Sequence, residues 1–436
     1  MAFVRQQNKL YTYLAVCYLV AGSVSLCLAQ SAAKNAASPP KTQILAKALD
    51  KGFVTARGIE LWRGKYELNN IGVNVQDLFL RYLTGDAASA KLDLTRASAF
   101  GVRFVRCGSG IHGTADFKRY SEDRATWYAA FRHMLSDADA SGIGIVHVLL
   151  PDLSVLASLG QAPTAQAALR QGSPQNSAAV AYASGMASEF RDDARLLFWE
   201  IGDEYNRDAD LEDASIALKC SSDAVRQFLI QIARTIHAAD RHHLVSSGCG
   251  DVRPDSWHLR QTALYHKSSG ASAPDNIVGD TGAMDSFEQY AEMIRFYAPS
   301  PIDIVSVHLN PPGESKVKWL IEDDEHAFRL PWIRQAASAF PSNPQGSVLG
   351  KPLFVGAFGQ DWQSGAKSVE PAWTLDLLKR ARSDAGPVLA LRQSATIPPS
   401  PTAQQKLQEV PIEVMNQIMN LNQLMLSAAR DSPYIK

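Results

Sequence analysis

The chain of 436 residues has almost no excess charge of either sign. It contains 43 lysines and arginines against 44 aspartates and glutamates, a formal net charge of −1. Nucleic-acid-binding surfaces and membrane-bound polybasic segments both depend on an excess of basic residues, so neither partner is expected. The composition is that of an ordinary globular protein, long enough for one large domain or two medium ones.

Two widespread motifs are also missing from the chain. There is no GxxxxGK[ST] sequence of the P-loop type and no GxSxG sequence of the nucleophile-elbow type. His242 and His243 are sequence neighbours, and in a strand their side chains point to opposite faces. They therefore do not form a metal-binding pair, and we expect no metal site.

A glycine-rich stretch is present, because Gly108, Gly110 and Gly113 spell GxGxxG directly after a predicted strand. A dinucleotide site requires the third glycine to open a helix and an acidic strand end about 20 residues later. We expect the segment TADFKRYSED to intervene before the next helix, and no such acidic residue follows. The stretch therefore predicts a flexible loop, and no cofactor is expected.

Cysteines are few, five in all, and two of them belong to the N-terminal segment described next. The other three are Cys107, Cys220 and Cys249, an odd number for an exported chain. At most one disulfide can form among them, and three buried free thiols are the alternative.

The N-terminal residues 1–29 have the pattern of a signal peptide. Arg5 and Lys9 precede an uncharged run that ends in small residues, with a plausible cleavage site after Ala29. Residues 30–44 form an Ala/Ser/Pro-rich tether. We expect a secreted or periplasmic protein with no membrane attachment after cleavage, although a run of about 20 residues also suits an uncleaved anchor helix.

From residue 45 to residue 436 we expect a single domain in which strands and helices alternate. The eight strand candidates are FVTARGIEL, VRFVRCG, GIGIVHVLL, LLFWEIG, HLVSSG, DIVSVHL, PLFVGAFG and PVLALRQS. Their continuous apolar runs indicate a parallel sheet covered by helices. Eight units predict a (β/α)8 TIM barrel, with an open doubly wound sheet as the alternative.

The segment FWEIGDE carries the most informative carboxylates. Glu200 and Glu204 share parity, so both side chains point the same way along an extended run. In a barrel this places Glu200 inside and Glu204 at the carboxyl-terminal rim, where barrels do their chemistry. We expect Glu200 to be a buried charge paired with an arginine such as Arg106, and Glu204 to be functional.

These segments resemble those of a known family. FWEIGDEYN is similar to WEIGNE, the strand-four signature of clan A glycoside hydrolases, especially the family 5 cellulases and mannanases. KPLFVGAFG resembles their strand-seven signature KPLFVGEFG, GVRFVR a strand-two segment, and DIVSVHLN a strand-six segment. The resemblance implies carbohydrate as the partner, Glu204 as the acid/base, Arg106 as the arginine that braces the nucleophile, and His308 as the strand-six histidine.

Several residues depart from the family pattern. Asp203 stands where the family has the asparagine that contacts the sugar 2-hydroxyl, and Asn310 stands where strand six has tyrosine. No tryptophan follows Trp373, although the family's strand-eight tryptophan is expected near residues 391–394. Ala357 takes the place of the nucleophile. Retaining hydrolysis needs two carboxyl groups about 5 Å apart, and a methyl group cannot attack a sugar.

Replacement of the nucleophile also changes the charge near Arg106. Arginine stays ionised, and its burial without a partner is costly. We expect Asp203, or failing it Glu200, to lie within hydrogen-bond reach of Arg106. The alternative is a wet cleft in which solvent screens the guanidinium.

The sequence therefore predicts a monomeric glycoside-hydrolase-like barrel with a cleft for β-linked polysaccharide or oligosaccharide, impaired or inactive in retaining hydrolysis. One alternative is an active O-glycosyl hydrolase that uses Glu204 with another carboxylate, such as Asp361 in GQDW. A second is a non-catalytic protein-interaction barrel. Trp62, Trp199 and Trp362 are candidates for sugar stacking, with core packing as the alternative for each.

Overall fold

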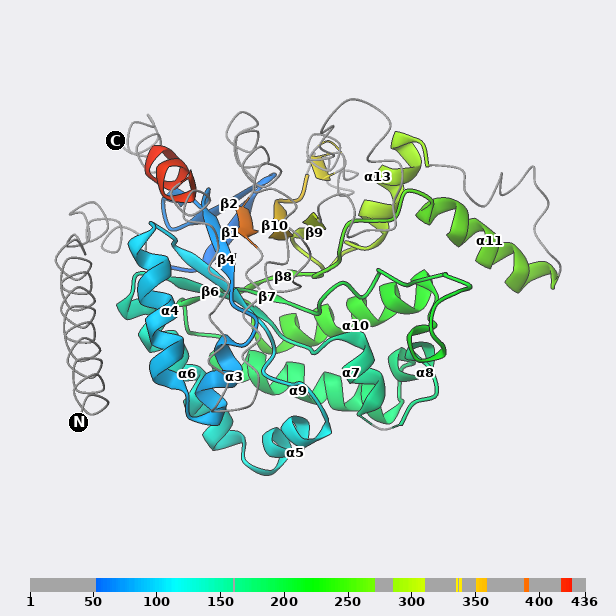
Figure 1. Cartoon of the computed structure of the whole chain (residues 1–436). Helices are drawn as coiled ribbons and strands as arrows, with labels where there is room; N and C mark the ends of the chain where they lie inside the picture. Colours follow the sequence, from blue (N-terminus) through cyan, green and yellow to red (C-terminus); the bar gives the residue numbers. More distant parts are fainter. Residues whose placement is uncertain are drawn as a thin grey trace, which may run out of the picture. The chain divides into compact units, whose positions relative to one another are not determined.

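The structure is a computed structural model, shown in Figure 1. It describes residues 52–159, 161–270, 285–309, 335, 337–338, 350–358, 388–391 and 417–425. The chain separates into two compact units, Met1–Leu49 and Asp50–Lys436, and all the described residues belong to the second. The predicted signal peptide and tether lie outside the described residues and stay predictions.

Eight parallel strands form the main sheet. They are β4 (Ile71–Asn74), β5 (Phe104–Cys107), β6 (Gly144–Val148), β7 (Leu196–Glu200), β8 (Leu244–Ser246), β9 (Val305–Leu309), β10 (Leu353–Phe358) and β11 (Val388–Leu391). Their order across the sheet is β8-β7-β6-β5-β4-β11-β10-β9, and every neighbouring pair is parallel. Parallel strands linked through helices confirm the α/β class predicted from the sequence.

The two edge strands of this sheet, β8 and β9, approach each other. An isolated parallel bridge joins Ser246 to Ile304. The backbone N–H groups of Asp303 and Ile304 both donate to the carbonyl oxygen of Val245, at 2.8 and 3.1 Å. The strand order followed across this bridge is the order of the strands along the chain. The contact is shorter than a strand ladder, but it brings the two edges together.

Seven of the eight predicted strand segments contain a strand of the sheet, and the first does not. The segment FVTARGIEL forms β1 (Val54–Arg57) and the start of β2 (Glu60–Arg63), which pair antiparallel in a separate three-stranded sheet with β3 (Tyr66–Glu67). Gly58, at φ +63°, turns the chain between β1 and β2. The prediction was wrong because this glycine turn was taken as part of one long strand.

Side chains of the parallel strands alternate between two hydrophobic clusters. Those on the outer side, such as Val105, Ile145, Val245 and Val307, belong to a large cluster that includes helix residues. Those on the inner side form a smaller cluster: Phe104, Val146, Phe198, Ile304 and Phe354, with Val54, Leu61 and Leu68 from the region of the hairpin. In β7 the alternation is interrupted, since Leu197 belongs to the smaller cluster as well as Phe198. The inner residues come mainly from the first part of their strands, so the hairpin covers the amino ends.

Helices follow the strands, and those that contribute to the large cluster lie on the outer side of the sheet, whereas α11 (Ser256–Ser269) has no buried residues and extends away from it (Figure 1). The helices are α3 (Leu78–Thr84), α4 (Ala87–Ala99), α5 (Thr114–Glu122), α6 (Arg124–Ala140), α7 (Leu153–Ser158), α8 (Ala165–Leu169), α9 (Pro174–Phe190), α10 (Ser222–Ala239), α11 (Ser256–Ser269) and α13 (Phe287–Phe296), with a short 3-10 helix at Ile216–Leu218. Asp123, Ser173 and Ser221 cap α6, α9 and α10 by accepting backbone N–H hydrogen bonds. These caps fix where the covering helices begin.

A helical segment near the C-terminus, residues 417–425, is bound to the first parallel strand. The side chain of Asn422 accepts a hydrogen bond from the Ile71 backbone N–H and donates to the Ile71 carbonyl, both at 2.9 Å. It also donates to the carbonyl of Gly101 at 3.2 Å. One buried amide therefore satisfies both backbone groups of the residue that begins β4.

The glycine-rich stretch after β5 differs from the prediction. Helix α5 begins at Thr114, directly after Gly113, so the segment TADFKRYSE is itself helical. Gly108 lies so close to the backbone of Gln76 that a Cβ atom would come within 2.6 Å of its carbonyl oxygen. Gly110 adopts φ +73° beside Phe79. Close packing against the β4–α3 connection therefore explains these two glycines, and the expected late start of the helix was wrong.

Cys107, Cys220 and Cys249 are buried and free, which confirms the free-thiol alternative. No helix within the described residues is long and apolar enough to cross a membrane.

Candidate active site

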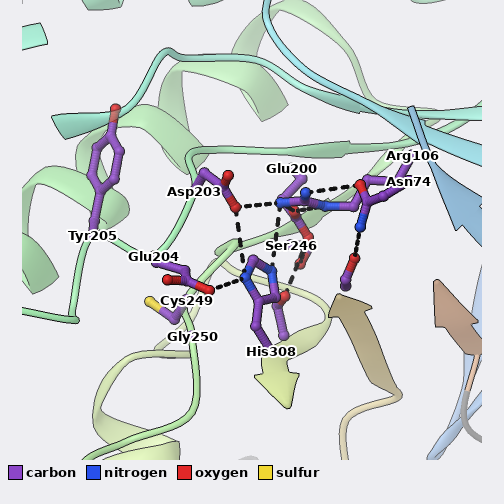
Figure 2. Close-up of polar contacts among 12 residues, drawn as sticks. Asn74, Arg106, Glu200, Asp203, Glu204, Tyr205, Ser246, Cys249, Gly250 and His308 are labelled. Atoms are coloured by element: carbon purple, nitrogen blue, oxygen red, sulfur yellow. Dashed lines mark hydrogen bonds and ion pairs between the residues drawn. The ribbon is translucent and has the colours of Figure 1, made fainter. Parts of the chain in front are cut away.

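Polar side chains gather at the carboxyl ends of the parallel strands, as Figure 2 shows. They are Asn74 of β4, Arg106 of β5, Glu200 of β7, Ser246 of β8 and His308 of β9, with Asp203 and Glu204 in the loop after β7. The carboxyl ends of parallel strands are where α/β folds place their ligands and their chemistry. This end of the sheet is therefore the candidate active site.

Arg106 and Glu200 form the buried centre of the site. Both side chains are fully buried, and Nε of Arg106 donates to Oε1 of Glu200 at 2.6 Å. The second carboxylate oxygen, Oε2, accepts hydrogen bonds from the hydroxyls of Ser246 and Ser306 at 3.1 and 3.2 Å. A buried carboxylate with both oxygens satisfied is a structural group, as the sequence predicted for Glu200.

Asp203 contacts the same guanidinium from the other side. Nη2 of Arg106 donates to Oδ1 of Asp203 at 2.7 Å, so both expected partners lie within hydrogen-bond reach. Burial by itself lowers the pKa of Arg106, yet the carboxylates of Glu200 and Asp203 raise that pKa above its ordinary value. The Asp203 side chain remains 35% exposed. Arg106 is therefore paired twice, once in the interior and once at the surface of the site.

Asn74 was not identified from the sequence, and it completes the set of partners around Arg106. Its Oδ1 accepts from Nη1 of Arg106 at 3.1 Å, and its Nδ2 donates to the carbonyl of Gly356 at 2.7 Å. The side chain links β5 to β10 next to Ala357. Its strand was missed because IGVN is short and follows two further asparagines; the apolar–polar alternation of IGVNV was the available signal.

Glu204 has a backbone conformation that side chains rarely adopt. Its φ is +54°, in the left-handed region, where a non-glycine residue is disfavoured. Its N–H donates to the carbonyl of Gly248 at 2.8 Å. Close contact with Gly250 limits the space around its side chain, since a Cβ there would lie 3.2 Å from Cγ of Glu204. Strain of this kind is maintained by the surrounding structure and often accompanies function.

His308 connects Glu204 to the strands. Its Nδ1 lies 2.9 Å from Oε1 of Glu204, and its Nε2 lies 3.5 Å from Nη2 of Arg106. A Cβ atom at position 356 would lie 2.7 Å from Nε2 of His308, so Gly356 leaves room for the imidazole. The Glu204 side chain is 16% exposed, whereas that of His308 is almost completely buried. Glu204 is thus held at the edge of the site with one oxygen against His308.

Ala357 lies beside this group. It is the register partner of His308 in the β9–β10 ladder, where the register shifts between Val355 and Ala357. Val355 and Phe358 belong to the outer cluster. Ala357 therefore faces inward on the same side as His308. The sequence-predicted residues Arg106, Asp203, Glu204, His308 and Ala357 come together here.

A buried thiol, Cys249, also lies close to the site. Cys249 precedes the glycine that contacts Glu204 and lies beside Glu204 in Figure 2. Burial raises the pKa of the Cys249 thiol to about 12. The thiolate is the reactive form of cysteine, so Cys249 is not a nucleophile near neutral pH.

Two of the three tryptophans proposed for sugar stacking lie elsewhere. Trp199 is fully buried on the outer side of β7, and its Nε1 donates to Asp240 at 2.8 Å. Trp62 belongs to the hairpin at the amino ends of the strands, where Arg57 lies 4.4 Å above its ring. The stacking hypothesis was wrong for both, because aromatic residues near strand ends also serve core and hairpin packing.

Other predicted site residues are not covered by the structure. Asn310, Asp361 and Trp362 lie outside the described residues, as do residues 392–394. Within the described part of the chain, no group of three or more His, Cys, Asp and Glu side chains is arranged to hold a metal ion.

Comparison with known proteins shows which structures this fold resembles. No protein-family model matches the sequence, and no curated protein sequence matches it. An endo-1,4-beta-mannanase from Rhizomucor miehei has a TM-score of 0.56 at 15% identity, covering 86% of this chain and 99% of that chain. A mutant of a glycoside hydrolase family 5 mannosidase from the same organism gives 0.56 at 14%, covering 87% and 99%.

An endo-beta-1,4-mannanase from Thermotoga petrophila gives a TM-score of 0.55 at 12% identity, covering 83% of this chain and 77% of that chain. Identities this low show a shared fold and nothing finer. The protein therefore has a fold similar to that of family 5 glycoside hydrolases.

Proposed function

We propose that this protein is a glycoside-hydrolase-type (β/α)8 barrel that binds β-linked polysaccharide or oligosaccharide at the carboxyl ends of its strands. The observation that carries the proposal is the group of Arg106, Asp203, Glu204 and His308 at those ends, on a fold similar to that of β-mannanases. The bridge between Ser246 and Ile304 supports closure of the sheet between β8 and β9. The signal-like N-terminus supports export of the protein.

We further propose that hydrolysis through an enzyme nucleophile is impaired. Ala357 offers only a methyl group beside His308, so no side chain at that position can attack an anomeric carbon. Glu204 can still act as a general acid, an effect of typically about 10²–10⁴-fold. Arg106 does not need a carboxylate at position 357, since Glu200 and Asp203 already pair with it.

Calorimetric titration of the full chain with β-1,4-linked manno- and cello-oligosaccharides tests binding. We expect saturable binding that Glu204→Ala weakens by about tenfold, or about 1.4 kcal/mol. Asp192→Ala is the matched control, because Asp192 is a highly exposed acid just before the amino end of β7. It should leave the affinity unchanged.

The outcomes separate this proposal from its alternatives. If the folded chain binds neither these sugars nor any other β-linked sugar, the carbohydrate site is wrong and an interaction barrel is favoured. Efficient turnover of aryl β-mannosides by the unmodified chain that is lost in Asp361→Asn would favour an active hydrolase with Asp361 as the second carboxylate.

A further inference from the structure

The two adjacent carboxylates after β7 are held close together but in different ways. Oδ1 of Asp203 lies 3.6 Å from Nδ1 of His308, and Oε1 of Glu204 lies 2.9 Å from the same nitrogen. The two carboxylates therefore cannot be farther apart than these two distances combined. Asp203 is held by the guanidinium of Arg106. Glu204 is held by the imidazole at Oε1, and its Oε2 lies 3.5 Å from the exposed guanidinium of Arg207.

The surroundings of Asp203 and Glu204 suit the two carboxylates to different contacts with a ligand. Oδ1 of Asp203 is occupied by Arg106, but its side chain is 35% exposed and its Oδ2 has no hydrogen-bond partner among the described residues. Asp203 can therefore accept a hydrogen bond from a ligand N–H while remaining anchored. Glu204, with 16% of its side chain exposed, reaches the surface of the site and can exchange a proton with a ligand oxygen.

From this arrangement, and resting on the carbohydrate site proposed above, we propose that the substrate is a β-linked 2-acetamido sugar that supplies its own nucleophile. The acetamido oxygen would take the role that Ala357 cannot fill. Substrate-assisted hydrolysis of this kind is an established alternative to an enzyme nucleophile in retaining glycosidases. Glu204 is then the acid/base, and Asp203 holds the acetamido N–H.

The reaction balances with water alone. In the first step the carboxylic acid of Glu204 gives its proton to the glycosidic oxygen, and the bond from that oxygen to C1 breaks. A lone pair of the acetamido oxygen forms a new bond to C1, which gives a cyclic oxazolinium ion. In the second step water attacks C1 and gives a proton to the Glu204 carboxylate, while the electron pair of the C1–acetamide bond returns to the oxygen.

The carboxylate at position 203 suits this chemistry better than an amide. Positive charge develops on the acetamido group as its oxygen bonds to C1, and a fixed carboxylate at the N–H stabilises that charge. An asparagine there would offer only a neutral acceptor. Arg106 keeps the Asp203 side chain in place, so little reorganisation is needed during the reaction.

The test compares 4-methylumbelliferyl N-acetyl-β-D-glucosaminide with the corresponding β-D-glucoside and β-D-mannoside, using the full chain. We expect cleavage of the acetamido substrate only. Fluorination of the acetyl group weakens its oxygen as a nucleophile, so kcat should fall steadily from the acetyl to the trifluoroacetyl substrate. This series uses the unmodified chain and does not depend on the folding of a variant.

Variants test the role of Asp203. We expect Asp203→Asn to lower kcat on the acetamido substrate by about 10²–10³-fold, the usual effect of removing one group that stabilises transition-state charge. Asp192→Asn, at an exposed carboxylate before the amino end of β7, should leave kcat unchanged.

Three results would overturn the inference, and they are distinguishable. A chain that binds manno- or cello-oligosaccharides but does not cleave the acetamido substrate would leave the proposed function standing and remove this substrate class. Rates that do not change along the fluorinated series would exclude participation by the acetamido group. Failure to bind any sugar, acetamido or not, would remove the proposed function and this inference together.

Discussion

The guanidinium of Arg106 donates through Nε to Oε1 of Glu200 across 2.6 Å, and both side chains are fully buried. The pair connects β5 to β7 at the base of the candidate site. Because the Ser246 and Ser306 hydroxyls satisfy the other carboxylate oxygen, Glu200 has no acceptor left for a substrate. The charge that a glutamate at position 357 would have provided is thus not needed to keep Arg106 paired.

The two carboxylate partners of Arg106 should differ in their effect on stability. Glu200→Gln leaves a buried arginine without its interior partner, so we expect the free energy of unfolding to fall by about 3–5 kcal/mol. Asp203→Asn acts at a partly exposed group, and we expect a loss of about 1 kcal/mol or less. Urea denaturation of both variants measures the difference. Equal losses would mean that the interior pair has no special structural role.

A carboxylate introduced at position 357 should by itself add little hydrolytic activity. In Ala357→Glu the new carboxylate enters beside His308, the register partner of position 357. Arg106 is already bound by Glu200 and Asp203. We expect little turnover of an aryl β-mannoside by this variant, because transition-state contacts act as a unit. An increase in kcat of several orders of magnitude would show that the residue at position 357 alone limits hydrolysis.

Stability should depend on pH through His147. Burial lowers the pKa of His147 from 6.5 to about 3, so the folded state keeps this imidazole neutral while the unfolded state binds a proton. Its contribution is fully present above pH 6.5 and is lost as the pH falls toward 3, by about 1.4 kcal/mol per pH unit. His147→Gln should remove this contribution to the slope of unfolding free energy against pH, whatever the substitution does to stability at neutral pH.

The carboxyl group of Asp77 should affect the pH dependence of stability in the direction opposite to that of His147. Burial raises the pKa of Asp77 from 3.8 to about 6, so its protonation favours the folded state as the pH falls through 6. Asp77→Asn should therefore make the loss of stability between pH 6 and 4 steeper. If the His147 and Asp77 variants showed the same slope as the unmodified chain, neither group would be buried as described.

The contact between the C-terminal helical segment and β4 should contribute to stability. Asn422→Leu leaves the N–H and C=O of Ile71 without their side-chain partner, and we expect a loss of about 1–3 kcal/mol. Leu424→Ala is the control, because Leu424 is 47% exposed on the same segment and should change stability by about 0.5 kcal/mol or less. Thermal or urea unfolding of both variants measures this, and equal effects would contradict the role of Asn422.

Much of the sheet could be predicted from the sequence, because long apolar runs mark buried parallel strands. The segments around Arg106, Glu200, His308 and Ala357 each contain the expected strand. The first strand was misplaced, since the hairpin holds more β-branched and aromatic residues than the four-residue β4. Runs of β-branched and aromatic residues indicate that a segment prefers to form a strand. They do not show whether that strand joins the main sheet or a separate hairpin.

Side-chain parity predicted that Glu200 points into the site, where it pairs with Arg106. The parity argument was wrong for Glu204, because β7 ends at Glu200 and Glu204 lies in the loop beyond it. The left-handed conformation of Glu204 could not be predicted, because it depends on contacts with Gly248 and Gly250 from a different strand end. The role of Asn74 also depends on a long-range contact, to Gly356 on β10. Such contacts arise from the fold and leave no local pattern in the sequence.

A crystal structure of the full chain with a bound β-linked oligosaccharide tests the central claim most directly. We predict that a glycosidic oxygen lies within about 3 Å of the Glu204 carboxyl group. The C1 atom of the same sugar should face Ala357, with its 2-substituent toward Asp203. An oligosaccharide bound away from the carboxyl ends of β7 and β10, with no sugar unit reaching Glu204, would contradict the account.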